Sequence, residues 1–150
     1  MACRGMPGAP MAAVSLLSMG TVSRVSSVLN KDAKQFGKKY LFDGNEDTCW
    51  NSDQGTPQWI LLEFPKSVEI SHLHIQFQGG FASRTCRLEG CTKNEAFEKI
   101  TDLYPEDINA LQRFTVSGKP VEKLKIVFEN STDFFGRIIV YHLDVLGRKL

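Results

Sequence analysis

The alternation of apolar and polar residues in short runs constrains the fold of this chain more than any other feature. Leu73, Ile75 and Phe77 alternate with polar neighbours, so an extended strand would place all three side chains on one face. The same period of two recurs in three further runs, which are 60–64, 124–128 and 138–145. The last run is apolar on much of both faces, as is typical of a central strand. The runs therefore predict strands around a common core.

Turn-forming sequences separate these runs. They are Asp43-Gly44, Gln54-Gly55-Thr56-Pro57, Gly79-Gly80 and Ser117-Gly118-Lys119-Pro120. Many short strands with such turns predict an all-β sandwich or barrel. Only residues 94–103 indicate a short helix, with Phe97 and Ile100 facing inward. The residues expected to be buried are Ile60, Leu62, Leu73, Ile75, Leu124, Ile126, Tyr141 and Leu143.

The length and charge of the chain limit its class. With 150 residues we expect a single domain with a sizeable core. Lys plus Arg number 18 and Asp plus Glu 17, so the net charge of +1 gives no general attraction for nucleic acid or an anionic membrane. The start of the chain is rich in Pro, Gly and Ala, and its apolar stretch 11–19 resembles a secretory signal only weakly. We therefore expect a disordered, dispensable leader over residues 1–20 and one domain over 21–150.

The four cysteines are Cys3, Cys49, Cys86 and Cys91. Their even number permits disulfides, but their spacing matches neither a CxxC pair nor a zinc ribbon. Because Cys3 lies in the expected leader, three cysteines remain for the domain. We therefore favour reduced thiols and an intracellular compartment.

No pattern in the chain is typical of catalysis. There is no G-x-S-x-G motif and no phosphate-binding glycine loop. His72 and His74 lie two residues apart on a face expected to be solvated, without a third metal ligand. We expect a protein that is not an enzyme and that uses no cofactor.

Two segments have the composition of a binding surface. Residues 76–84 and 130–137 each combine aromatic residues with glycine, a polar side chain and an arginine. Aromatic residues and arginine are enriched at protein interfaces. We expect one of the two neighbouring phenylalanines of the second segment to be buried, and both segments to lie at one end of the fold. The candidate partner-binding residues are Gln78, Phe81, Arg84, Phe134, Phe135 and Arg137.

Several short motifs follow one another in a recognisable order. Residues 26–27 and 41–50 are similar to the patterns S-S, L-x-D-G and T-x-W, in which Trp50 would enter the core and Thr48 would fix the turn before it. Residues 58–64 resemble a W-I-x-V-D-L strand. In these motifs the chain resembles the discoidin, or coagulation factor 5/8 type C, domain family. The resemblance implies an eight-stranded antiparallel jelly-roll sandwich of the galactose-binding-like type.

Five other segments make the resemblance to one group within this family more specific. They are 21–30, 48–55, 75–81, 104–107 and 133–137. Here the chain is similar to small nuclear members of the family that associate with an orphan nuclear receptor. The resemblance implies binding to the testicular orphan receptor, repression of its transcriptional activity, and a location in the nucleus, with the cytoplasm as a second compartment. We expect a monomer that contacts neither nucleic acid nor membrane directly.

Two departures from the family pattern bear on ligands. Members that bind calcium place an acidic residue of the last strand opposite the Asp43-Gly44 turn, and His142 takes that position here. Imidazole is a poor ligand for a hard cation, so we expect no calcium site. The apolar spikes of membrane-binding members would fall at residues 31–37, which are polar and basic here.

Two other functions remain open from the sequence. One is a lectin-like module that binds carbohydrate or lipid headgroups. The other is nucleic-acid binding through four lysines, Lys38, Lys39, Lys123 and Lys125. The expected reduced thiols, the lack of a calcium site and the weak leader favour the protein-interaction module over the lectin. The balanced net charge argues against nucleic-acid binding.

Overall fold

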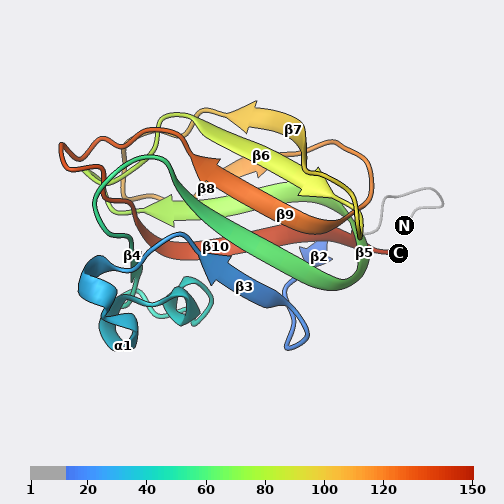
Figure 1. Ribbon diagram of the computed structural model, residues 1–150, viewed down its shortest axis with the longest axis horizontal. Helices are drawn as coiled ribbons and strands as arrows, with labels where there is room; N and C mark the ends of the chain where they lie inside the picture. The colour runs from blue at the N-terminus through green and yellow to red at the C-terminus, as the bar shows by residue number, and fades with distance from the viewer. Residues whose placement is uncertain (1–12) are drawn as a thin grey trace, which may run out of the picture.

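The computed structural model describes residues 13–150, which form two packed layers of antiparallel strands (Figure 1). The strands of this region are β2 (Val14–Ser15), β3 (Val22–Val25), β4 (Trp50–Asn51), β5 (Gln58–Phe77), β6 (Cys86–Cys91), β7 (Glu98–Leu103), β8 (Gln112–Thr115), β9 (Val121–Phe128) and β10 (Ile139–Lys149). Three helical turns connect β3 to β4, and they are η1 (Leu29–Lys31), α1 (Ala33–Phe36) and η2 (Lys38–Leu41). The predicted all-β sandwich is confirmed.

The long strand β5 joins the two layers. Its first part pairs with β3 and β9, and β6 and β7 extend that layer beyond β9. Its second part pairs with β8 and β10 in the other layer. The pairing with β9 loses register between Glu63 and Val68, a stretch that contains Pro65. Proline has no N–H to donate to the ladder, so the strand can bend there from one layer into the other. Figure 1 shows the two green parts of β5 in front and behind.

The period-two runs supply the core between the layers. Seven of the eight residues expected to be buried are buried, and they are Ile60, Leu62, Leu73, Ile75, Leu124, Ile126 and Leu143. Tyr141 is the exception and is only half-buried. The register of β10 against β5 shifts between Val140 and His142, so Tyr141 is the extra residue of a bulge. Its hydroxyl donates to Gln78 Oε1 at 2.7 Å instead of entering the core.

The predicted helix over residues 94–103 is wrong. Residues 98–103 form strand β7, which pairs with β6, and Ile100 is half-buried. Phe97 precedes the strand and is exposed. Pairing with a neighbouring strand supplies the backbone hydrogen bonds that an isolated helical turn would have to make by itself, and it overrides the local preference.

Residues 14–17 pack on the sandwich, which differs from the disordered leader expected for residues 1–20. β2 pairs with the end of β10, and Leu16 N donates to Val145 O at 2.8 Å. The Leu16 side chain is 1% exposed and belongs to the hydrophobic core. This part of the expected leader therefore contributes to the hydrophobic core. Residues 1–12 of the predicted leader, with Cys3, lie outside the described residues.

A chain that starts at Thr21 should accordingly be less stable than the full chain. Loss of the fully buried Leu16 should lower the free energy of unfolding by ~2–4 kcal/mol. Leu16→Ala in the full chain should reproduce most of this loss in a urea titration. Val14→Ala is the matched control, because Val14 belongs to the same segment but is exposed. Equal stability of the full and shortened chains would contradict the packing of this segment.

Candidate functional site

Four loops meet at the end of the sandwich opposite the C-terminus. They are 52–57, 78–85, 104–111 and 129–138, and together they are named the loop end here. In Figure 1 they lie at the left, beyond the ends of the strands, with 129–138 drawn in orange-red. All six candidate partner-binding residues lie in two of these loops. A rigid sandwich holds such loops in fixed positions, as a recognition surface requires.

A tight turn over residues 133–136 forms part of the loop end. Gly136 N donates to Asp133 O at 3.0 Å, which closes the turn. The Asp133 carboxylate accepts from the backbone N–H and from Nε of Arg137, both at 3.1 Å. Burial alone would raise the pKa of Asp133, but the bonds and charge of Arg137 outweigh it and lower the pKa below its usual value. The carboxylate therefore stays charged at neutral pH and holds the turn.

Phe134 and Phe135 occupy the middle of this turn, where neither is buried. Their exposed fractions are 94% and 55%, so the expectation that one of them enters the core is wrong. The turn directs both side chains outward, and the rings pack edge to face with their centroids 5.2 Å apart. Exposed aromatic side chains on a hydrogen-bonded turn are preorganised for contact with another molecule.

The aromatic turn is anchored on the neighbouring loop 52–57. Gly55 N donates to Phe135 O at 2.9 Å. Gly136 has a φ of +85°, and a Cβ added to it would lie 2.8 Å from Gly55 N. Only glycine combines this backbone conformation with so close an approach. The position of the aromatic pair is thus fixed by two loops that are about eighty residues apart in the sequence.

The structure brings Phe81 and Arg137 together. The guanidinium carbon of Arg137 lies 5.0 Å from the centroid of the Phe81 ring, while Nε is paired with Asp133. Arg137 is therefore tied into the fold through its Nε and through the face of its guanidinium. Arg84 is different: its side chain is exposed, and only its backbone N–H is used, in a 2.9 Å bond to Asn130 Oδ1. Gln78 is held through Oε1 by Tyr141.

The sequence interpretation missed the polar residues that position the loop end. Gln58 is buried at the start of β5; its Oε1 accepts from Ser27 Oγ at 2.7 Å and its Nε2 donates to Gly55 O at 2.7 Å. Asp107 and Asn109 accept from the backbone N–H groups of Gly80 and Gly79, at 2.7 and 2.8 Å. The sequence feature that could have indicated this role of Gln58 is its position as a polar residue at the start of an otherwise apolar strand.

The turn before Trp50 has the predicted form. Thr48 Oγ1 donates to Asp43 Oδ2 at 2.6 Å and lies 3.2 Å from Asn45 O. The carboxylate of Asp43 also accepts from Asn45 N at 3.0 Å. Burial by itself would raise the pKa of Asp43, but these bonds and the nearby His142 lower it. His142 therefore lies close enough to the turn to affect the pKa of Asp43, which agrees with the position that the family resemblance predicted for it.

These residues do not fit a calcium ion. The oxygens of Asp43 are used inside the turn, and the neighbour from β10 is an imidazole, which is a poor ligand for a hard cation. Within residues 13–150, no three His, Cys, Asp or Glu side chains are grouped as metal ligands.

Millimolar calcium should therefore leave the melting temperature unchanged, since only a ligand that binds the native state raises it. The measurement is a thermal melt with calcium and with a chelator. A rise in melting temperature that Asp43→Ala abolishes would show that the turn binds the ion after all.

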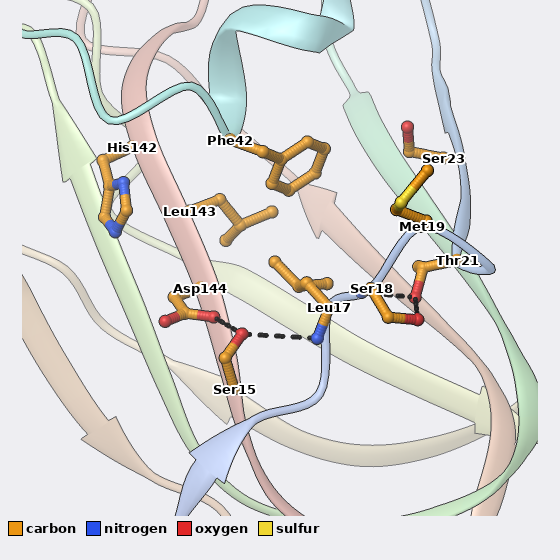
Figure 2. A pocket seen from close by; sticks show the side chains of 10 residues that line it. All are labelled: Ser15, Leu17, Ser18, Met19, Thr21, Ser23, Phe42, His142, Leu143 and Asp144. Carbon is orange, nitrogen blue, oxygen red and sulfur yellow. Dashed lines mark hydrogen bonds between the residues drawn. The ribbon is translucent and has the colours of Figure 1, made fainter.

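A hollow lies beside β10, away from the loop end. Figure 2 shows Leu17, Phe42 and Leu143 around it, with Asp144 at its border. Ser15 Oγ donates to Asp144 Oδ1 at 2.7 Å and accepts from Leu17 N at 3.3 Å. The volume of the hollow is about 400 Å³. None of the candidate partner-binding residues lines this hollow, and the carboxylate at its border, Asp144, is already paired with Ser15.

The cysteines of the described region are free thiols. Cys86 and Cys91 are buried and Cys49 is half-buried. Burial raises the pKa of Cys86 to about 12, so this thiol is protonated and unreactive at neutral pH. The buried thiols serve as small apolar side chains. In the same part of the chain, no helix has the length and apolar character needed to cross a bilayer.

The strand arrangement defines the class of the protein, which has a β-sandwich fold of the galactose-binding-like type. The model of the F5/8 type C domain matches residues 21–137, so the chain belongs to this family, as predicted.

Relatives and solved structures agree with this assignment. The chain is 68% identical to the "Nuclear receptor 2C2-associated protein" of Xenopus laevis over 133 residues, which are 89% of this chain and 98% of that protein. An F5/8 type C domain from Bacteroides fragilis superimposes with a TM-score of 0.78 at 14% identity, covering 94% of this chain and all of that one. A family 32 carbohydrate-binding module from C. perfringens NanJ, solved with galactose, gives 0.74 at 17% identity, over 90% and 99%. At these identities the solved structures show the fold alone.

Proposed function

We propose that this chain is a non-enzymatic interaction module that binds a nuclear receptor of the 2C2 type and represses its transcriptional activity. The name of the 68% identical relative supports a receptor-associated role. Relatives this similar over nearly their whole length usually keep their binding surfaces. The proposal places the protein in the nucleus, with the cytoplasm as a second compartment, and as a monomer.

The loop end is proposed as the receptor-binding surface. The observation that carries this assignment is the exposed pair Phe134 and Phe135 on a turn fixed by Asp133 and Gly55. Clustered aromatic residues supply most of the energy at many interfaces, and a rigid turn lowers the entropy lost on binding. Arg84 adds an exposed charge in the adjacent loop, while Phe81 and Arg137 serve mainly to support the surface.

The test is a binding titration of the purified chain with purified receptor 2C2, together with a receptor-driven reporter in cells. We expect saturable binding, and repression of the reporter that depends on it. Phe134→Ala and Arg84→Ala should each weaken binding by ~1–3 kcal/mol with little change in stability, because both side chains are exposed. If both variants bind like the wild type, the loop end is not the interface. If the wild type does not bind the receptor at all, the proposed function fails.

The lectin-like alternative is examined in the same titration with galactose in place of the receptor. The geometry disfavours it, because the Arg137 guanidinium lies over the Phe81 ring, at the place where a sugar would stack on this aromatic side chain. Galactose binding that Phe81→Ala abolishes, without receptor binding, would favour the lectin over the interaction module.

A further inference from the structure

A groove that is separate from both the loop end and the hollow beside β10 lies between β3, α1 and the outer face of β5. This groove has a volume of about 430 Å³, and Trp59 lines it together with Val25, Val28, Arg24 and Lys38. It is named the Trp59 groove here. It shares no residue with the loop end, so its role goes beyond the proposed receptor contact.

Trp59 gives the groove an aromatic surface on the outside of the sandwich. It alternates with the buried residues Gln58 and Ile60, so its side chain faces outward and is half-buried. Lys125 from β9 places its Nζ 5.1 Å from the centroid of the indole ring. An outward tryptophan that contributes nothing to the core is typical of a contact residue for another molecule.

The charge around the groove is strongly one-sided. Residues 24–39 contain five cations and one acid, although the whole chain has a net charge of only +1. Arg24 and Lys38 line the groove, and Lys31 and Lys34 are exposed on the adjacent helical turns. Arg24 Nε lies 3.5 Å from Glu63 Oε1, so Glu63 pairs with Arg24 and not with the other cations near the groove. The groove therefore complements an acidic ligand.

One edge of the groove is suited to an extended chain. β3 pairs with β5 on one side, and within the described residues no strand pairs with its other side. There the Ser23 carbonyl accepts from Lys38 Nζ, a flexible side chain that can be displaced. An extended peptide beside an unpaired strand edge gains main-chain hydrogen bonds in addition to side-chain contacts.

We propose that the Trp59 groove binds an extended acidic segment of a partner protein, with one apolar side chain against Trp59 and carboxylates at Arg24 and Lys38. A membrane surface fits less well. Within residues 24–41 no large apolar side chain is exposed, so this region has nothing to insert into a bilayer.

The test uses a short synthetic peptide in which glutamates flank a Leu-Leu pair. The chain has two tryptophans, and Trp50 is fully buried, so a change in emission on titration reports Trp59. We expect saturable binding that weakens with added salt. Arg24→Gln combined with Lys38→Gln should weaken binding about tenfold or more. Lys93→Gln combined with Lys119→Gln is the matched control, since both lysines are exposed and outside the groove. Thermal melts confirm that both double variants fold.

Three results would overturn the proposal. One is equal affinity of the wild type and the Arg24, Lys38 double variant. Another is equal affinity for a peptide with Ser-Ser in place of Leu-Leu, which would mean general attraction of anions. The third is tighter binding of phosphatidylserine vesicles or of a single-stranded oligonucleotide, which would assign the surface to a membrane or to nucleic acid. Each result leaves the receptor contact at the loop end untouched.

Discussion

Replacement of Trp50 by alanine should lower the free energy of unfolding by ~3–5 kcal/mol. Trp50 is fully buried, and its ring centroid lies 6.0 Å from that of Phe128, which in turn packs on Phe77 at 5.8 Å. The indole Nε1 donates to Ser27 O at 2.9 Å. The substitution would therefore leave a large cavity in the core, and the Ser27 carbonyl would lose its hydrogen-bond donor. Urea unfolding followed by circular dichroism measures the loss.

Two further variants separate packing from hydrogen bonding. Trp50→Phe keeps much of the buried volume but loses the bond to Ser27, so it should cost less than Trp50→Ala. Trp59→Ala is the matched control on the outer face of β5 and should cost under ~1 kcal/mol, because this ring lies outside the core. A loss below ~1.5 kcal/mol for Trp50→Ala would show that the aromatic cluster is not the centre of the core.

The second large effect concerns the receptor contact. Phe134→Ala combined with Phe135→Ala should weaken receptor binding ~100-fold, about 1–2 kcal/mol for each ring. Both side chains are exposed, so stability should change by less than ~0.5 kcal/mol. Calorimetric titration measures the first quantity and a thermal melt indicates the second.

The control for this pair is Phe97→Ala. Phe97 is also an exposed phenylalanine, but it precedes β7 outside the loop end. It should leave binding unchanged. Equal binding by the wild type and the Phe134, Phe135 double variant would remove the aromatic turn from the interface. Equal losses for this variant and Phe97→Ala would indicate a general loss of apolar surface rather than a specific contact.

The candidate site was predicted only in part. The composition of residues 76–84 and 130–137 correctly placed aromatic and arginine side chains on neighbouring loops. It did not reveal that the Arg137 guanidinium lies over the Phe81 ring, or that both phenylalanines of the turn face outward. The position of the phenylalanine turn depends on Gly55 and on the buried Gln58 that holds its loop. Both lie far from the turn in the sequence, so no local pattern contains the information.

The sequence by itself determined the four strand segments at 60–64, 73–77, 124–128 and 138–145 and most of their buried faces, because side chains alternate with a period of two whatever the partner strand is. It also determined the turn over Asp43-Gly44, the core position of Trp50 and the family. Only the tertiary structure decided that residues 98–103 pair as a strand, that Leu16 completes the core and that Tyr141 sits in a bulge. The Trp59 groove likewise exists only because α1 lies beside β5 in space. Each of these features depends on which distant segments meet, and that is set by the packing of the whole sandwich rather than by any single stretch of the chain.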